Sequence, residues 1–318
     1  MGLMMTDTKN IPSEFHDLVI IGAGPAGLAA GIYAARDKQD VVLLEKLSPG
    51  GQVLTTDLVE NYPGFADGIS GFELMDSIRR QAERFGLKIL SREVKGVDLT
   101  EGVKRLSLAS GSMEAHSVIV ATGAQPRKLG IKGEEFLTGK GVSYCGTCDG
   151  PFYRDRDVAV IGGGDTAVQE AIFLTRFASH VYLIHRRDEL RATRILQERA
   201  FANDKIELVW DTIPLSIQGE TGVEGLRLRN VKTGQESDLE ADGVFVFVGT
   251  RPVTGFLGEA VALDGQGFVK VDRRQETSVK GVFAAGDVTS ETPRQIATAV
   301  GEGVTAVLNA EEYLEEKD

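Results

Sequence analysis

The two cysteines of this 318-residue chain lie three positions apart, in the segment Cys145-Gly146-Thr147-Cys148-Asp149-Gly150. A pair at this spacing can close a small, reducible disulfide ring, so the pattern predicts thiol–disulfide exchange. A zinc site would need about four ligands, and none of His16, His116, His180 and His185 forms a metal-spaced cluster with the pair. We therefore predict a redox pair and no metal. Asp149 is a candidate to give and take protons beside it, with a turn-capping role as the alternative.

A glycine-rich turn near the start of the chain has the pattern that binds a dinucleotide. Gly22-Ala23-Gly24-Pro25-Ala26-Gly27 is a G-x-G-x-x-G motif between an apolar strand at 17–21 and a helix expected at 25–36. Gly22 makes the tight turn, Gly24 lets a diphosphate approach the backbone, and Gly27 permits close helix packing. The helix N-terminus then holds the phosphates. Glu45, at the end of the next strand (41–45), can accept hydrogen bonds from ribose hydroxyls.

A second turn repeats this arrangement, with a different residue at the end of the second strand. Gly162-Gly163-Gly164-Asp165-Thr166-Ala167 lies between a strand at 158–161 and a helix expected at 166–177. Gly22 to Glu45 and Gly162 to His185 both span 23 positions, so His185 replaces the acid. Arg186, Arg187 and Arg191 follow it. Guanidinium groups favour a 2′-phosphate, which indicates NADPH rather than NADH. Alternatively, these arginines pair with Asp188 and Glu189 at an exposed helix start.

The first site is expected to hold FAD rather than NAD, because a later segment offers further contacts for a long cofactor. Gly286-Asp287 follows a strand at 281–285, where the aspartate can bind a ribityl or phosphate group. The last helix is expected to begin at Pro293-Arg294-Gln295 and end near residue 314. Its positive end can face the pyrimidine side of a flavin, where negative charge accumulates on reduction. A helix-cap or turn role is the alternative for Asp287.

The order of these segments predicts an α/β fold with two Rossmann-like domains, the second inserted in the first. Further apolar strands at 118–122 and 244–248 close the two units. The FAD-binding domain comprises residues 1–124 and 252–318, and the NADPH-binding domain with the cysteine pair comprises 125–251. Gln125-Pro126 and Arg251-Pro252 mark the crossings, because proline stops regular structure there.

Composition excludes some classes of partner. The net charge is −12, from 35 basic and 47 acidic residues, which argues against nucleic acid or an anionic membrane. No apolar run approaches the roughly 18 residues of a membrane span, and residues 1–10 lack the pattern of a secretory signal. Two cysteines do not make a disulfide-stapled secreted scaffold. We expect a cytoplasmic protein.

Taken together, the motifs resemble the low-molecular-weight, bacterial-type thioredoxin reductases, which are class II FAD/NAD(P)-dependent pyridine nucleotide-disulfide oxidoreductases. The resemblance covers nearly the whole chain and adds these segments to those above: Gly50-Gly51-Gln52, Glu60-Asn61-Tyr62-Pro63-Gly64, Ala121-Thr122-Gly123 and Ser143-Tyr144. It implies a homodimer that reduces thioredoxin, with Cys148 beside the flavin, Cys145 attacking the thioredoxin disulfide and Asp149 as acid and base. It also implies FAD contacts from Gly51, Gln52, Asn61, Thr122, Gly123, Arg294 and Gln295.

The chain departs from the family pattern at three positions. Gly146 stands where alanine is common, and Asp165 where asparagine is common; neither is expected to matter much. Pro151 stands where an aromatic residue often helps to hold the partner, although Phe152 remains. Other functions stay open: reduction of another small disulfide protein, ferredoxin as donor, dithiol oxidation by oxygen, or a flavin-bound redox sensor without turnover. Relatives that use ferredoxin or oxygen typically lose the basic nucleotide cluster, which this chain retains.

Overall fold

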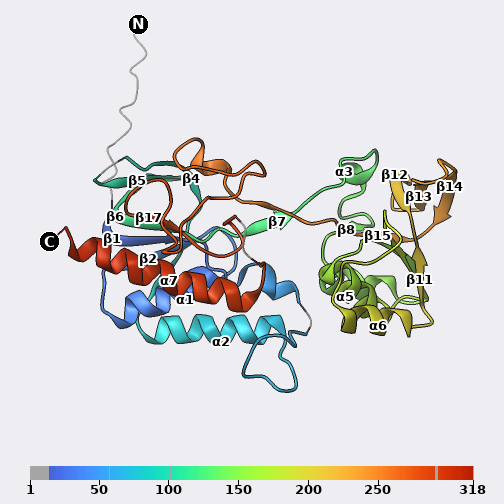
Figure 1. The fold of residues 1–318 in the computed structure, drawn as a ribbon, viewed down its shortest axis with the longest axis horizontal. Helices are drawn as coiled ribbons and strands as arrows, with labels where there is room; N and C mark the ends of the chain where they lie inside the picture. The colour runs from blue at the N-terminus through green and yellow to red at the C-terminus, as the bar shows by residue number, and fades with distance from the viewer. Residues whose placement is uncertain (1–13, 57, 101, 291–292, 318) are drawn as a thin grey trace, which may run out of the picture. The chain divides into compact units, whose positions relative to one another are not determined.

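The computed structural model describes residues 14–56, 58–100, 102–290 and 293–317, so residues 1–10, discussed above, lie outside the described residues. The chain divides into two compact units (Figure 1). Unit 1 runs to Gln125 and resumes at Arg251, and unit 2 is Pro126–Thr250.

Unit 1 is built on a seven-stranded sheet, counted within the described residues. Its order is β3-β2-β1-β6-β5-β4, and β17 also pairs with β6. The pairs β1–β2, β1–β6, β2–β3 and β17–β6 are parallel, whereas β4, β5 and β6 pair antiparallel. The strands are β1 (Glu14–Ile21), β2 (Val41–Glu45), β3 (Lys88–Ser91), β4 (Val94–Asp98), β5 (Lys104–Leu108), β6 (Ser112–Val120) and β17 (Val282–Ala284).

Three helices cover one face of this sheet: α1 (Pro25–Arg36), α2 (Gly71–Arg84) and α7 (Ile296–Glu315) (Figure 1). Leu18 and Ile20 of β1 point into the core under these helices, while Val19 and Ile21 point into a second core on the other face. Because both faces are buried over residues 18–21, this part of β1 appears in the sequence as a continuous apolar run. Short 3₁₀ turns at Gly51–Thr55 and Gly255–Leu257 complete the unit.

Unit 2 contains a five-stranded parallel sheet, within the described residues, in the order β11-β10-β9-β15-β8. Its strands are β8 (Val142–Ser143), β9 (Asp157–Gly162), β10 (His180–Ile184), β11 (Ile206–Val209) and β15 (Gly243–Phe247). The helices are α3 (Glu134–Leu137), α4 (Gly146–Asp149), α5 (Asp165–Leu174) and α6 (Arg194–Phe201), with a 3₁₀ turn at Gly150–Tyr153. With the β-α-β unit of unit 1, this confirms the predicted fold class of two Rossmann-like domains.

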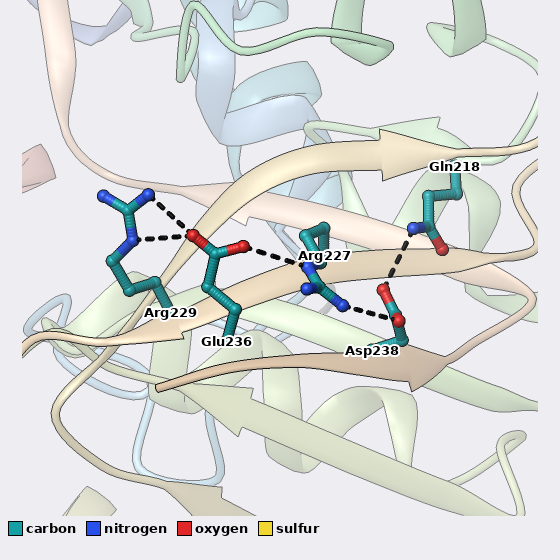
Figure 2. Close-up of polar contacts among 5 residues, drawn as sticks. All are labelled: Gln218, Arg227, Arg229, Glu236 and Asp238. Atoms are coloured by element: carbon teal, nitrogen blue, oxygen red, sulfur yellow. Dashed lines mark hydrogen bonds and ion pairs between the residues drawn. The ribbon is translucent and has the colours of Figure 1, made fainter. Parts of the chain in front are cut away.

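A three-stranded antiparallel sheet, β12 (Thr212–Gln218), β13 (Gly225–Asn230) and β14 (Glu236–Glu240), completes unit 2. Leu226 and Leu228 lie on its buried face. On the other face, Arg229 pairs with Glu236 at 2.8 Å and Arg227 with Asp238 at 2.7 Å (Figure 2). Charged side chains on an edge strand such as β14 oppose pairing with another chain.

The two crossings between the units pair as short strands, β7 (Ala124–Pro126) and β16 (Thr250–Pro252). Each ends at the proline that marked the crossing in the sequence. Two helices differ from their expected bounds. α7 begins at Ile296 instead of 293, because Gln295 is extended (φ −129°, ψ 150°). α5 ends at Leu174 instead of 177, because the next residues form tighter i→i+3 turns, such as Arg176 N–H to Phe173 C=O.

No helix within the described residues combines the length and apolar character that a membrane span requires.

Candidate redox and nucleotide-binding sites

Cys145 and Cys148 form a disulfide whose Cα atoms are 5.4 Å apart. The pair follows β8 directly, and Ser143 at the end of that strand holds Cys145 in place. Its hydroxyl accepts a hydrogen bond from the Cys145 N–H at 3.0 Å and donates to the Cys145 carbonyl at 3.1 Å. The Cys148 N–H donates to the Cys145 sulfur at 3.1 Å. Cys148 is exposed and Cys145 half-buried, so solvent reaches the disulfide.

Asp149 ends the short helix α4 beside the disulfide and is half-buried. Burial, followed by the charge of Asp149, raises the pKa of Tyr153, so this carboxylate and this phenol are close enough to interact. Gly146 packs against α5, where an added Cβ would meet the carboxylate of Glu170. That carboxylate is the far end of a flexible side chain, and an alanine at this position requires only a small movement of it.

In unit 1, the turn from Gly22 to Gly27 has the shape of a diphosphate cradle. Gly22 has a φ of +105°, and a Cβ there would collide with the backbone of Ala121. A Cβ on Gly27 would collide with the carbonyl of Gly22, so this glycine is required for packing. At Gly24, by contrast, an added Cβ meets nothing within 4 Å. The open side of the turn therefore lies where a diphosphate would approach.

Glu45 is tied to this turn. One carboxylate oxygen accepts the N–H of Ala23 at 2.8 Å, and the other accepts the N–H of Leu47 at 2.9 Å. The two hydrogen bonds fix the orientation of the side chain. Each carboxylate oxygen has a further lone pair, so the residue can still accept hydrogen bonds from ribose hydroxyls.

Asp287 lies at the other side of the same cradle. It follows Gly286, whose φ is +78° and whose Cβ position is 3.0 Å from the Cβ of Ala26 in α1. Among the described residues, none donates a hydrogen bond to the half-buried Asp287 carboxylate. Burial raises its pKa, and the charge of Arg294 partly opposes this shift. A half-buried acceptor without a protein donor fits a hydroxyl-bearing ligand.

Sequence reasoning missed Glu302, which supports the Asp287 loop from α7. Its carboxylate accepts the N–H of Gly286 at 2.7 Å, and the side chain is buried. The sequence does contain an indication of this role. Glu302 lies on the apolar face of the last helix, between Ala299 and Ala306, where a carboxylate is rare without a specific partner.

The remaining unit 1 residues implied by the resemblance fall into two groups. Gly51 lies against the turn, since its Cβ position is 3.2 Å from the Cα of Gly24. Near the crossing, the Gln52 side chain donates to the Ala124 carbonyl, and the Thr122 hydroxyl donates to the Val253 carbonyl at 2.8 Å.

The second group lies before α7. The Asn61 side chain donates to the Gln295 side-chain oxygen at 3.0 Å, and the Arg294 guanidinium stacks on Phe268, 4.3 Å from the ring centroid. Gly123 has a φ of +66° beside the crossing.

In unit 2, His185 takes the place of Glu45 but acts differently. Its ring packs on Gly163, where an added Cβ would overlap it. The side chain is buried, and its Nε2 atom has no hydrogen-bond partner among the described residues. Burial, and then the charge of Arg191, lowers the pKa of His185, so the ring is neutral at physiological pH. Unlike Glu45, His185 brings no charge to the nucleotide turn.

The positive charge comes from Arg186, Arg187 and Arg191, which are all exposed. Within the described part of the chain, no ion pair involves any of the three. Asp188, the partner suggested by the alternative interpretation, pairs with Lys232 at 2.7 Å instead. The backbone N–H of Arg191 donates to the Gly163 carbonyl at 2.7 Å. Exposed guanidinium groups are therefore held beside the Gly162–Ala167 turn, where they can bind an anion.

Among the described residues, no three or more His, Cys, Asp or Glu side chains are grouped to hold a metal ion.

A family model described as pyridine nucleotide-disulphide oxidoreductase matches residues 16–303. The chain belongs to this family. It is 50% identical over 304 residues to a thioredoxin reductase of Mycolicibacterium smegmatis, covering 95% of this chain and 98% of the relative. It is 48% identical over 305 residues to that of Streptomyces coelicolor, covering 95% of each. The crystal structure of Lactococcus lactis thioredoxin reductase superimposes with a TM-score of 0.93 at 41% identity, covering 95% of this chain and 99% of that one. The resemblance to thioredoxin reductases is thereby confirmed.

Membership of the pyridine nucleotide-disulphide oxidoreductases means that this oxidoreductase uses a flavin and a pyridine nucleotide. The residues present fit both groups. In unit 1, the open side at Gly24 and the Asp287 carboxylate offer a cradle and a hydroxyl acceptor. In unit 2, the second turn lies beside guanidinium groups that have no ion-pair partner among the described residues.

Proposed function

We propose that this chain is an NADPH-dependent thioredoxin reductase that passes electrons through FAD and the Cys145–Cys148 disulfide to thioredoxin. One observation carries the proposal. A disulfide that includes the exposed Cys148 shares a chain with two dinucleotide turns, and the second turn has three exposed arginines beside it that make no ion pair within the described residues. The relatives named thioredoxin reductase support the same activity.

In this proposal, the domain of residues 1–124 and 252–318 binds FAD, and the domain of residues 125–251 binds NADPH. Gly24 and the start of α1 receive the FAD diphosphate, Glu45 the ribose and Asp287 the ribityl chain. Gly162 and Gly164, with the backbone N–H groups of Asp165 and Thr166 at the start of α5, receive the NADPH diphosphate. Arg186, Arg187 and Arg191 bind its 2′-phosphate. When bound, the flavin supplies two-electron transfer between the nicotinamide and the disulfide.

The cysteines carry out the remaining chemistry. Two electrons and two protons convert the disulfide to a pair of thiols. The Cys145 thiolate then attacks the thioredoxin disulfide, which forms a mixed disulfide and releases one thioredoxin sulfur. Cys148 attacks the Cys145 sulfur, restores the original disulfide and releases the second thioredoxin sulfur. Asp149 takes the proton from the attacking thiol and gives it to the leaving thiolate.

The proposal extends to the partner and the assembly. Phe152, four residues after Cys148, is 78% exposed. A large apolar side chain exposed beside a redox pair is suited to contact a protein substrate, and we assign it to thioredoxin docking. The resemblance supports a homodimer and a cytoplasmic location, where thiols are kept reduced.

Anaerobic stopped-flow spectroscopy tests the electron route. NADPH should bleach the flavin of the purified protein much faster than NADH does, and oxidised thioredoxin should restore the colour. In Cys148→Ser and in the matched Cys145→Ser variant, NADPH should still bleach the flavin, but thioredoxin should no longer be reduced. A purified protein without flavin, or full turnover in either variant, would refute the proposal.

A second measurement separates the two sulfurs. With Cys148→Ser, the remaining Cys145 thiol should trap thioredoxin as a stable mixed disulfide, visible on a non-reducing gel. With Cys145→Ser, little such complex should form. The opposite pattern would exchange the two roles.

A further inference from the structure

The segment from Arg186 to Thr193 carries the three arginines and is held against the second nucleotide turn. Leu190 and Ala192 are buried in the core of unit 2, which leaves Arg191 between them exposed. The Gln197 side chain of α6 donates to the Ala192 carbonyl at 2.7 Å. These contacts attach the segment to the core and to α6, but they do not set its position relative to the phosphate-binding turn.

Two hydrogen bonds set that position. One joins the Arg191 N–H to the Gly163 carbonyl at 2.7 Å. The other joins the Thr193 N–H to a carboxylate oxygen of Asp165 at 2.6 Å. Asp165 is the first residue of α5 and follows Gly164, whose Cβ position is open. The side chain that accepts from the arginine segment therefore belongs to the turn that would hold the diphosphate.

An aspartate at this position has two opposing effects on a bound nucleotide. Its negative charge stabilises the helix N-terminus, but it repels a diphosphate at the same place. The repulsion acts on every dinucleotide, because all of them contain the diphosphate. The hydrogen bond from Thr193 has a different effect, since it fixes the segment whose arginines face the 2′-phosphate.

We propose that Asp165 is a positioning residue that sets the preference for a 2′-phosphorylated nucleotide by holding the arginine segment on the phosphate-binding turn. This inference rests on the proposed use of NADPH. It differs from the expectation that aspartate in place of asparagine matters little. The acceptor oxygen of Asp165 governs the preference, and its charge governs the affinity for all dinucleotides.

Thr193→Pro removes the donor, and because the proline Cδ takes the place of the amide hydrogen, the Asp165 carboxylate must also move away. The φ of Thr193 is −58°, which proline adopts without strain, and its side chain makes no capping hydrogen bond. Thr193→Ala is the matched control, because it keeps the N–H. Asp165→Asn keeps an acceptor oxygen and removes the charge, whereas Asp165→Ala removes both.

Isothermal titration of the flavin-loaded protein with 2′,5′-ADP and with ADP measures the preference without turnover. Thr193→Pro and Asp165→Ala should each lower the ratio of the 2′,5′-ADP affinity to the ADP affinity by about 3- to 10-fold, as expected for an exposed hydrogen bond to a charged group. Thr193→Ala should leave the ratio unchanged. Asp165→Asn should tighten both ligands by a similar factor of about 3 and keep the ratio.

An unchanged ratio in both Thr193→Pro and Asp165→Ala would overturn the inference. Asp165→Ala also tests it independently if the proline variant fails to fold, which circular dichroism and flavin content would reveal. If the unmodified protein binds 2′,5′-ADP no better than ADP, the proposed NADPH specificity itself is wrong and the inference falls with it. The two failures are therefore distinguishable.

Discussion

Tyr144, directly before the redox pair, is expected to stabilise unit 2 through a hydrogen bond, and this contribution to the free energy of unfolding falls at high pH. Its hydroxyl donates to the Glu134 carboxylate at 2.8 Å. Glu134 is 2% exposed and also accepts the N–H groups of Leu129 at 2.8 Å and Gly130 at 2.7 Å. This buried carboxylate thus joins the first loop of unit 2 to the residue before Cys145. Tyr144→Phe removes one of the three donors to Glu134, together with a hydrogen bond between the Tyr144 hydroxyl and the Thr138 side chain.

The loss of stability expected for Tyr144→Phe at pH 8 follows from the charge of the acceptor. A hydrogen bond to a charged group contributes about 1.5–3 kcal/mol. Glu134 keeps two backbone donors when the hydroxyl is removed, so the lower end applies. We expect Tyr144→Phe to lower the free energy of unfolding of unit 2 by about 1.5 kcal/mol at pH 8.

The pH dependence has a definite sign. Burial, with the hydrogen bond and the charge of Glu134, raises the pKa of Tyr144 to about 12, against about 10 in the unfolded chain. Between these values the folded state binds more protons than the unfolded state, so stability falls as pH rises. Phenylalanine does not ionise. The difference in the free energy of unfolding between the native protein and Tyr144→Phe should therefore decrease by about 1 kcal/mol between pH 9 and pH 11, after allowance for solvent screening.

Urea denaturation, followed by the fluorescence of the single tryptophan, Trp210, measures this difference, because that residue packs against a core of unit 2. Tyr33→Phe, at an exposed tyrosine of unit 1, is the control and should not change the transition of unit 2. If the free energies of unfolding of the native protein and Tyr144→Phe differ by the same amount at pH 9 and pH 11, the assigned hydrogen bond to Glu134 is wrong.

Three further outcomes are expected. Replacing Arg186 and Arg187 together by alanine should raise the KM for NADPH at least about 10-fold, since two charge-assisted contacts are lost, and the KM for NADH less than twofold; an equal rise in steady-state assays would show that they do not bind the 2′-phosphate. Gly27→Ala should at least halve the flavin absorbance per protein, because its Cβ would collide with the Gly22 carbonyl; full flavin content would contradict the packing argument. Arg229→Ala should lower stability by no more than about 0.5 kcal/mol in urea denaturation, because its ion pair with Glu236 is exposed (Figure 2); a loss above about 1.5 kcal/mol would indicate a tertiary role.

Two of the three β-α-β elements around the first nucleotide turn could be predicted from sequence with correct bounds, whereas β1 begins at Glu14, three residues before the predicted strand. The helix at 25–36 and the strand at 41–45 have the residues expected of them. Their signals are local: a buried parallel strand is a continuous apolar run, and glycines mark the turn that follows it. Helix ends were less predictable, because the start of α7 depends on the extended conformation of Gln295 rather than on a local stop signal.

The polar contacts that orient the candidate sites could not be predicted. Glu134 meets Tyr144, Glu302 meets Gly286, and Asp165 meets Thr193. These partners are 10, 16 and 28 positions apart, and no motif fixes their spacing. Each depends on how a loop packs against a helix, which is a property of the tertiary structure.

On the proposed assignment of FAD to the first turn and NADPH to the second, one position at the end of a strand changes the ligand without changing the fold. Glu45 accepts the N–H groups of Ala23 and Leu47, so its charge lies at the turn, where a 2′-phosphate would be repelled. His185, at the equivalent position, packs its neutral ring on Gly163 and brings no negative charge there. The exposed arginines that follow can then face an anion. In the proposed function, the preference of the second site for a 2′-phosphate therefore depends as much on the absence of a negative charge at His185 as on the positive charges of the arginines.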